Sequence, residues 1–287
     1  MRIIICVKQV PDVVDVKIDT YSNKLIREGV LSIINPFDEF VVEEAVRIKE
    51  KHKGEVIAIS MGPTKALDVL KICLAMGADK GYLLSDAALA GSDTLTTSFA
   101  LSCFIKQLHY DLVICGLESI DSSTGHVGPE IAEKLGIPQI TFVCKIDINP
   151  NVRKGIFTRE TDTGYQIIEA KLPILITLVK GINVPREPDT TLIKENNIGK
   201  IGLKDIGIDS KMVGIDGSPT YVKKICKAKP LFRENMMINY KIPAHDRVKQ
   251  IMRGGMLEKS KNSKIEGKTE EIVNKACDFI LHNILKE

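Results

Sequence analysis

The sequence predicts a doubly wound α/β fold, in which a mostly parallel sheet is covered by helices on both faces. The first 145 residues alternate short apolar segments with amphipathic helical patterns, and this alternation is typical of parallel sheets buried on both sides. The 287 residues are 44% hydrophobic and 27% charged, as in ordinary folded proteins. Because no stretch approaches the roughly 18 apolar residues of a membrane helix, we expect neither membrane insertion nor a signal peptide.

Five strands are expected in this first part of the chain. We expect them to be joined by right-handed crossovers and to take the common spatial order 3-2-1-4-5. Their segments are residues 2–7, 55–60, 80–84, 112–115 and 139–144.

Helices are expected between the strands, because apolar residues recur there every three or four positions. In the first, Phe40, Val41, Ala45 and Ile48 share one stripe. Another has a polar cap at Asp93, just before its apolar run. The helical segments are residues 37–51, 64–76, 95–108 and 130–135.

Two β-hairpins are expected to interrupt this pattern. Residues 13–19 and 24–34 flank a polar turn after the first strand, and residues 155–158 and 165–170 flank another turn. Residues 174–179 then close the sheet. The chain becomes irregular after residue 180 and ends in a helix at 269–286. We therefore expect an α/β domain at 1–180 and a C-terminal arm at 181–287.

Charge and cysteine content exclude several classes of protein. The 40 basic and 37 acidic residues leave a net charge of only +3, too little to indicate a nucleic-acid partner. Residues 221–287 carry +7, which fits a solvated surface or, alternatively, a docking surface. The seven cysteines occur singly, without metal-ligand spacing, so we expect reduced thiols and a cytoplasmic location, with no disulfide framework or zinc site.

The expected sheet order places a candidate ligand site between strands one and four, where the order reverses. The loops there are residues 8–12 and 116–129, and the second contains three glycines and four hydroxyl side chains before a helix. Such a loop suits phosphate oxygens, but a plain turn that caps a helix is the alternative, because neither common phosphate-binding glycine motif is present. His126 has no partner visible in the sequence, and we expect no catalysis by this chain alone.

Several short motifs in order resemble the β subunit of electron-transfer flavoproteins. They extend over about 180 residues, which makes them more specific together than singly. The motifs are VKQVPD at 7–12, INPFDE at 34–39, VEEAVR at 42–47, AMGAD at 75–79, SDT at 92–94 and the stretch 111–129.

The resemblance implies a heterodimer in which an α subunit holds a redox FAD and electrons pass between an acyl-CoA or other dehydrogenase and an acceptor. Oxidoreductase activity would then belong to the complex. The resemblance also implies a second nucleotide, AMP or FAD, at the switch point of this chain. Its matching residues are Cys6, Asn35, Pro36, Phe37, Asp38, Met61, Gly116, Ser119, Asp121, Ser122, Ser123, Thr124, Gly125, His126 and Val127.

The stretch 121–129 is more similar to members that bind a second, electron-bifurcating FAD than to members that bind AMP. FAD is therefore favoured, with NADH as the electron donor if the protein bifurcates. One departure concerns the partner: the lysine cluster usual after the closing strand is missing, and Leu192 and Ile193 remain as apolar candidates for docking.

Two other classes of function compete with this interpretation. An ATP-using enzyme of similar sheet order would need a glycine-containing phosphate loop directly after the first strand, and residues 8–12 contain no glycine. A stand-alone module that senses adenine nucleotides would not need the long C-terminal arm.

Overall fold

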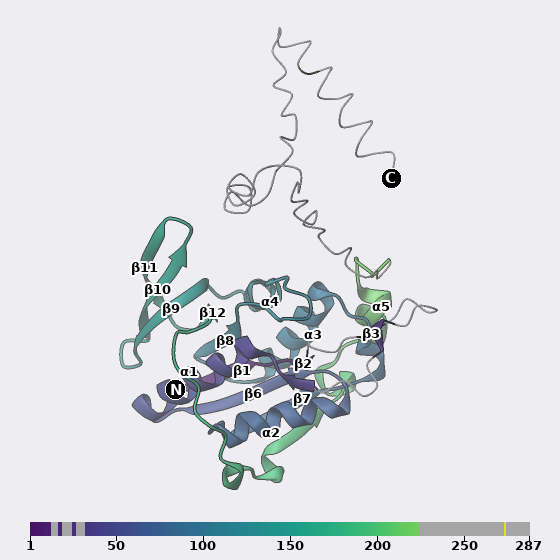
Figure 1. The fold of residues 1–287 in the computed structure, drawn as a ribbon, viewed down its shortest axis with the longest axis horizontal. Helices are drawn as coiled ribbons and strands as arrows, with labels where there is room; N and C mark the ends of the chain where they lie inside the picture. The colour runs from purple at the N-terminus through teal and green to yellow at the C-terminus, as the bar shows by residue number, and fades with distance from the viewer. Residues whose placement is uncertain (13–16, 19–24, 27–31, 224–272, 274–287) are drawn as a thin grey trace, which may run out of the picture. The chain divides into compact units, whose positions relative to one another are not determined.

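The structure is a computed structural model that describes residues 1–12, 17–18, 25–26, 32–223 and 273. All of these except residue 273 belong to one compact unit, Met1–Cys226. A nine-stranded sheet in the order β11-β10-β9-β12-β8-β1-β6-β7-β13 runs through this unit (Figure 1).

Seven neighbouring strands, from β9 to β13 in the spatial order, are parallel. The other two, β10 and β11, extend the sheet beyond β9 as antiparallel strands. This architecture confirms the predicted fold class. In spatial order the strands are β11 (Gly164–Lys171), β10 (Lys154–Thr161), β9 (Gln139–Asn149), β12 (Ile174–Leu178), β8 (Leu112–Gly116), β1 (Arg2–Cys6), β6 (Glu55–Met61), β7 (Lys80–Leu84) and β13 (Ile198–Ile201).

Four helices cover the sheet. α1 (Pro36–His52) and α2 (Leu67–Ala75) pack on one face, and α3 (Thr94–Gln107) and α4 (Val127–Leu135) pack on the other. All four lie where the sequence predicted helices. The shorter helices are η2 (Thr64–Ala66), η3 (Ala87–Leu89), η4 (Thr190–Leu192), η5 (Glu195–Asn197), η6 (Leu203–Ile206), η7 (Ser210–Met212) and α5 (Gly214–Gly217).

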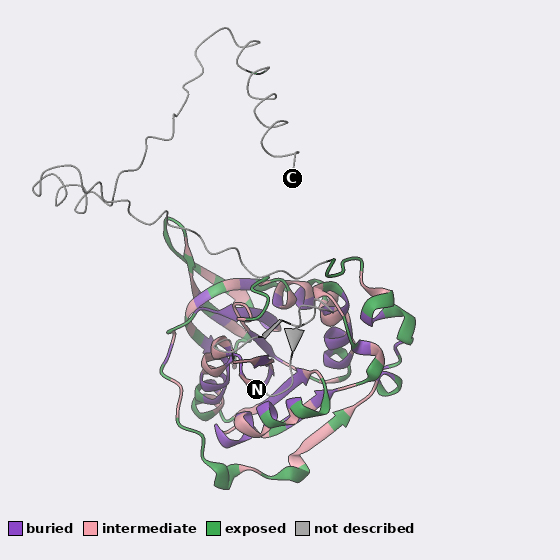
Figure 2. Cartoon of the chain, turned by 45° about the vertical axis from the view of Figure 1, so that its right-hand side comes forward, coloured by how far each residue is buried: buried purple, intermediate pink, exposed green. Residues whose placement is uncertain are grey.

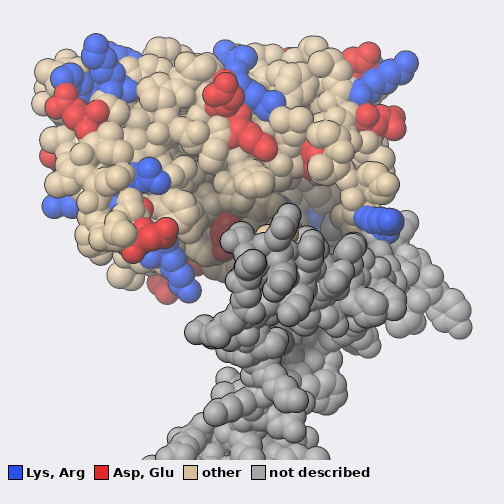
Figure 3. Space-filling view, turned by 90° about the horizontal axis from the view of Figure 1, so that it is seen from above, with Lys and Arg blue, Asp and Glu red and all other residues tan. Residues whose placement is uncertain are grey.

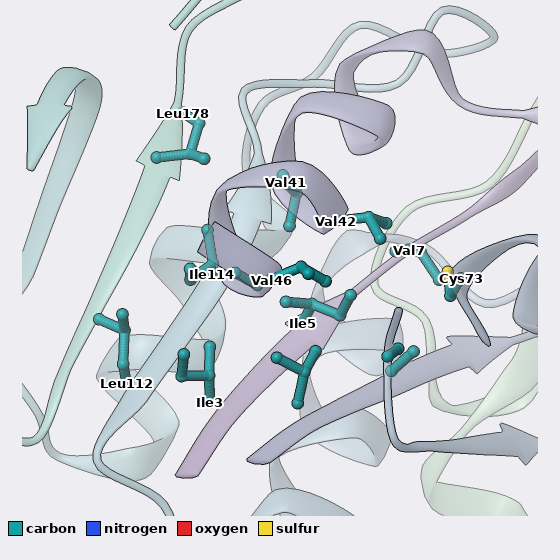
Figure 4. Close-up of a cluster of buried hydrophobic side chains, with 14 of the residues drawn as sticks. Ile3, Ile5, Val7, Val41, Val42, Val46, Cys73, Leu112, Ile114 and Leu178 are labelled. Atoms are coloured by element: carbon teal, nitrogen blue, oxygen red, sulfur yellow. The ribbon is translucent and has the colours of Figure 1, made fainter. Parts of the chain in front are cut away.

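The core lies on both faces of the sheet, because successive strand residues point to opposite sides. In β1, Ile3 and Ile5 belong to the cluster beneath α1 and α2, whereas Ile4 belongs to the cluster beneath α3 and α4. Val41 and Val46 of α1 lie over the first of these clusters (Figure 4). Burial accordingly follows the sheet and the inner sides of the helices (Figure 2).

The predicted strand order is right for the first four strands and wrong at the fifth. β12 lies between β8 and β9, so the strand predicted to close the sheet is instead an interior strand. The reason is visible in its burial, since all five residues of β12 are buried, whereas β9 alternates and continues into the hairpin. The edge strand β13 was not predicted, because its four residues include Gly199 and lie in a polar segment.

Both predicted hairpins are present. After β1, β2 (Gln9–Pro11) pairs with β5 (Ser32–Ile34), and β3 (Lys17–Ile18) pairs with β4 (Leu25–Ile26). The turn between β3 and β4 lies outside the described residues. β10 and β11 form the second hairpin, which projects from the body of the unit (Figure 1).

The chain after β12 contributes to the sheet domain as far as it is described. Leu203, Ile206 and Val213 are buried against the cluster beneath α3 and α4. The predicted final helix at 269–286 lies outside the described residues, except for Val273. None of the helices in the described ranges combines the length and the apolar character that a membrane crossing requires.

Basic and acidic side chains are intermixed on the face of the described unit that Figure 3 presents. Exposed pairs such as Lys51 with Asp147 and Lys154 with Glu169 place opposite charges next to each other. This intermixing is typical of a solvated protein surface.

Candidate functional site

The predicted switch point lies at the carboxyl ends of β1 and β8, which are neighbours in the sheet. Cys6 at the end of β1 is in register with Cys115 of β8. The loop 117–126 follows β8 and leads into α4, while the N-terminus of α1 lies beside the same edge, since its Asn35 contacts this loop. The structure therefore brings together the two segments that the sequence analysis placed around the site.

Asp38 is the buried carboxylate at the base of this site, with 4% of its surface exposed. One oxygen, Oδ2, accepts from the backbone N of Lys8 at 2.7 Å, and the other, Oδ1, accepts from Asn35 Nδ2 at 3.0 Å. Burial raises the pKa of Asp38 to about 7, although these two hydrogen bonds favour the ionised form. At Gly116 a Cβ would overlap Asp38 Oδ1, so glycine allows this carboxylate to lie close to the end of β8.

Asn35 joins the start of α1 to the loop after β8. Its Nδ2 also donates to the carbonyl of Glu118 at 2.9 Å, and its Oδ1 accepts from the backbone N of Ile120 at 3.2 Å. Asn35 is 1% exposed and occupies the N-cap position of α1, but its side chain does not cap that helix. The amide of Asn35 is therefore used to fix the conformation of the loop.

Lys8 forms the polar rim of the site together with the loop. Its Nζ lies 2.7 Å from Asp121 Oδ1 and 3.3 Å from Ser119 Oγ. The Oγ atoms of Ser119 and Ser122 are 2.9 Å apart. Burial opposes ionisation of Asp121, but hydrogen bonds from Lys8 and Ser119 outweigh it and hold the pKa of Asp121 below its usual range.

Lys8 belongs to the loop 8–12 that the sequence analysis placed at the site, but its side chain was not among the candidate site residues. Its partner Asp121 is 113 positions away in the chain, so no local pattern connects the two.

The outer part of the loop turns through backbone conformations that favour glycine. Gly125 has φ of +65° and Ser123 has φ of +50°, and the backbone N of Ser123 donates to the carbonyl of Ser119 at 2.8 Å. Ser122, Ser123, Thr124 and His126 are exposed. The hydroxyl groups of Ser122, Ser123 and Thr124 therefore lie on the outer surface of the loop, where a ligand can reach them.

The N-terminus of α4 adds backbone donors beside the loop. His126 occupies its N-cap position, but the His126 side chain accepts no hydrogen bond from the first turn. A Cβ at Gly128 would lie 2.9 Å from Thr177 Cγ2, so this glycine allows the helix to approach β12 closely. The uncapped positive end of α4 suits an anion.

The remaining predicted site residues form apolar surroundings. Cys6, Met61 and Val127 are half-buried and pack against the cluster beneath α3 and α4. Pro36 and Phe37 begin α1 and are also half-buried. The predicted set thus includes polar residues of α1 and the loop, and apolar residues of which Cys6, Met61 and Val127 lie on the face covered by α3 and α4.

The two predicted docking residues lie on a separate segment after β12. Leu192 ends the 3-10 helix η4 with 50% of its surface exposed, and Ile193 follows half-buried. This segment lies between Asp189, whose backbone N donates to the carbonyl of Ala75 at 2.9 Å, and Asn197, whose Nδ2 donates to the carbonyl of Asp79 at 2.9 Å.

The geometry argues against an ATP-using enzyme. A phosphate loop after β1 would need free backbone donors, but the backbone N of Val7 donates to Ile59 and that of Lys8 donates to Asp38. Within the described part of the chain, no group of His, Cys, Asp and Glu side chains is arranged to hold a metal ion.

Comparisons with known proteins agree with this architecture. A family model for the electron transfer flavoprotein domain matches residues 22–197. The electron transfer flavoprotein subunit beta of Thermoanaerobacterium thermosaccharolyticum is 48% identical over 226 residues, which cover 77% of this chain and 86% of that protein. The caffeyl-CoA reductase-Etf complex subunit CarD of Acetobacterium woodii is 44% identical over 227 residues, with 77% and 86% covered. Protein FixA of Azotobacter vinelandii is 39% identical over 239 residues, with 80% and 85% covered.

The fold and the loop at the switch point define a doubly wound α/β protein whose candidate site lies at the carboxyl edge of its sheet. The chain belongs to the electron transfer flavoprotein family, among its β subunits. Its role is therefore in electron transfer, as the resemblance of its short motifs implied.

Proposed function

We propose that this chain pairs with an α subunit and binds an adenine nucleotide, FAD, at the loop after β8. The heterodimer carries electrons between an acyl-CoA or other dehydrogenase and an acceptor. The observation that carries the proposal is the pair of hydrogen bonds by which buried Asn35 holds Glu118 and Ile120 of that loop. A loop fixed in this way presents its outer groups without an ordering cost on binding.

The residues present fit the phosphates of a nucleotide. Exposed hydroxyls of Ser122, Ser123 and Thr124 stand next to the uncapped N-terminus of α4, and both kinds of donor suit phosphate oxygens. Lys8 adds a positive charge at the rim, partly neutralised by Asp121. The apolar side chains of Cys6 and Met61 supply the surface on which an adenosine would pack.

FAD is proposed over AMP because of the loop sequence 121–129, which resembles that of the bifurcating members. At Gly125 a Cβ would lie 3.3 Å from the carbonyl of Leu117, so glycine suits this turn of the loop, and its small residues allow a pyrophosphate to approach the backbone. FAD would supply the hydride and single-electron chemistry that side chains cannot supply. The chain's own residues would bind the phosphates and orient the nucleotide, and NADH would be the donor.

The cytoplasm is the proposed location. The five cysteines within the described ranges, Cys6, Cys73, Cys103, Cys115 and Cys144, are all free thiols. Free thiols support a reducing compartment.

Cofactor content tests the nucleotide proposal. The heterodimer is purified from co-expression with its α subunit, treated with acid, and the released FAD and AMP are quantified against protein. Two FAD per heterodimer is the expected result. One FAD with one AMP would support the nucleotide site but contradict bifurcation. One FAD with no second nucleotide would contradict the nucleotide site itself.

Docking of the dehydrogenase is proposed for Leu192 and Ile193. Changing both to Ala should slow electron delivery at limiting dehydrogenase without loss of bound flavin, because apolar anchors at interface centres can each cost about 2 kcal/mol on truncation. Val184, which is 79% exposed, is a control for general loss of apolar surface. Unchanged transfer by the double variant would exclude this segment from the interface.

A further inference from the structure

A carboxylate with little solvent exposure lies on the outer side of α1, where a charged helix residue would ordinarily be solvated. The side chain of Glu43 is only 4% exposed. The chain segment that follows β12 covers it, since Arg186 of that segment lies directly over the Glu43 carboxylate. Because a buried carboxylate is costly without partners, Glu43 requires what this segment supplies.

Arg186 supplies hydrogen bonds from both its backbone and its side chain. Glu43 Oε2 accepts from the backbone N of Arg186 at 3.1 Å and from its Nε at 2.8 Å. The guanidinium also forms a bidentate pair with Glu50, at 2.7 Å to Oε1 and 3.2 Å to Oε2. Burial opposes ionisation of Glu43, yet Arg186 keeps the pKa of Glu43 below its usual range. One arginine therefore fixes its segment at two turns of α1.

Other contacts hold the same segment on either side of Arg186. Asn183 Nδ2 donates to the carbonyl of Phe40 at 3.0 Å and to Glu44 Oε2 at 2.9 Å. The backbone of Asp189 is held by Ala75, and the carboxylate of Asp189 accepts from the backbone N of Thr191 at 2.9 Å. The fixed segment thus runs directly into η4, which ends at Leu192.

We propose that Arg186 is a positioning residue that fastens its segment to α1 and thereby presents Leu192 and Ile193 to the dehydrogenase. The inference rests on the docking role proposed for these two residues. A fastened segment binds without first being ordered, so its fixation increases affinity for the partner. Arg is suited to this task, because its planar guanidinium can pair with two carboxylates at once.

The test uses the complete heterodimer and an acyl-CoA dehydrogenase that reduces the wild-type protein. Arg186→Ala should raise the apparent KM of the dehydrogenase for the heterodimer roughly five- to tenfold. A change of this size is expected when a few side chains must first be ordered on binding. The value of kcat and the flavin content should be unchanged. Amide hydrogen exchange at residues 187–194 should become faster in the same variant. A wild-type KM in Arg186→Ala would overturn the proposal.

Two further variants separate positioning from general destabilisation. Arg47 also pairs with Glu43, at 2.8 Å, but lies on α1 itself, so Arg47→Ala should leave both the KM and the exchange of 187–194 as in wild type. Glu50 is exposed, and Glu50→Gln removes one anchor of Arg186 without leaving a buried charge; it should raise the KM in the same direction by a smaller factor. If Arg47→Ala matched Arg186→Ala, the effect would belong to Glu43 and α1, and the proposal would be wrong.

A double-mutant comparison tests whether Arg186 acts through the apolar pair. In a protein that already carries Leu192→Ala and Ile193→Ala, adding Arg186→Ala should have little further effect on the KM. A full additional increase would show that Arg186 acts elsewhere and would overturn this inference. If the two alanine changes alone had no effect, the docking proposal itself would fail, which is distinct from failure of the Arg186 inference alone.

Discussion

Asp38 is a buried carboxylate, and two donors satisfy its two oxygens. The donors, Lys8 and Asn35, belong to the end of β1 and the start of α1. Through Asn35 the carboxylate also supports the loop after β8. A single side chain therefore fixes three segments of the candidate site relative to one another.

The protonation of Asp38 should make stability depend on pH. The pKa of Asp38 is about 7 in the folded chain, whereas that of an unperturbed aspartate is 3.8. The folded state therefore holds the proton more tightly than the unfolded state. The contribution of Asp38 to the free energy of unfolding therefore falls as the pH rises from about 4 to about 7, by at most about 1.4 kcal/mol per pH unit. Urea unfolding of wild type and Asp38→Asn across this range measures the difference.

Asp38→Asn should be less stable overall, because an amide has one acceptor oxygen for the two donors. Its pH profile should nevertheless lack the decline seen in wild type. Parallel profiles for the two proteins would show that Asp38 does not titrate in this range.

At the residue scale, sequence reasoning found the residue types but not their pairings. The short motifs indicated Asn35 and Asp38, and the polar residue before a helix correctly indicated Asp93 as a cap. The pairing of Lys8 with Asp121 and that of Arg186 with Glu43 and Glu50 join residues far apart in the chain. Such contacts depend on the final packing of the segments, which no local pattern encodes.

At the scale of elements, Asp93 connects α3 to the last described segment of the chain. Its carboxylate accepts from the backbone N of Thr96 at 3.0 Å and from Thr220 Oγ1 at 2.8 Å. Burial opposes ionisation of Asp93, but these hydrogen bonds outweigh it and hold the pKa of Asp93 below its usual range. The cap thus also fixes residues 218–220, through Ser218, whose Oγ accepts from the backbone N of Asp93 at 2.9 Å.

Asp93→Ala should lower the free energy of unfolding at neutral pH by about 1–2 kcal/mol, because α3 loses its N-cap. The difference from wild type should shrink as the pH falls through the folded pKa of Asp93, since the stabilisation requires the carboxylate. Asp86 is a matched control, because it caps only the three-residue helix η3. Denaturant unfolding should show a much smaller effect for Asp86→Ala, and equal effects would contradict the argument.

Elements were predictable where the period of apolar residues is clear, as in the helices and the strands of the parallel core. The position of β12 was not, because strand order depends on which strands bury both faces. Its five buried residues, Ile174 to Leu178, are a pattern that could have indicated an interior strand. β13 is short, contains glycine and pairs only at one edge, so its sequence carries little signal.

At the scale of the whole molecule, the proposed function requires assembly with an α subunit. The basic C-terminal stretch 221–287 carries a net charge of +7, and we propose that the arm docks on that subunit. Deleting residues 267–287, which lie outside the described residues apart from Val273, should weaken assembly and leave the sheet domain folded. Co-purification yield and the cooperativity of melting measure the two effects. Full recovery of the heterodimer would show that residues 267–287 have no docking role.

The most direct test of the central claim, that the loop after β8 holds a nucleotide, is the nucleotide content of two matched variants. Gly125 and Gly136 lie near opposite ends of α4 with φ of +65° and +69°, so valine imposes similar backbone strain at each, of about 1–2 kcal/mol. Only Gly125 lies in the loop, and nothing lies within 4 Å of a Cβ at Gly136. After acid release, Gly125→Val should lack one nucleotide per heterodimer while Gly136→Val retains the wild-type content. Full nucleotide content in Gly125→Val would contradict the account.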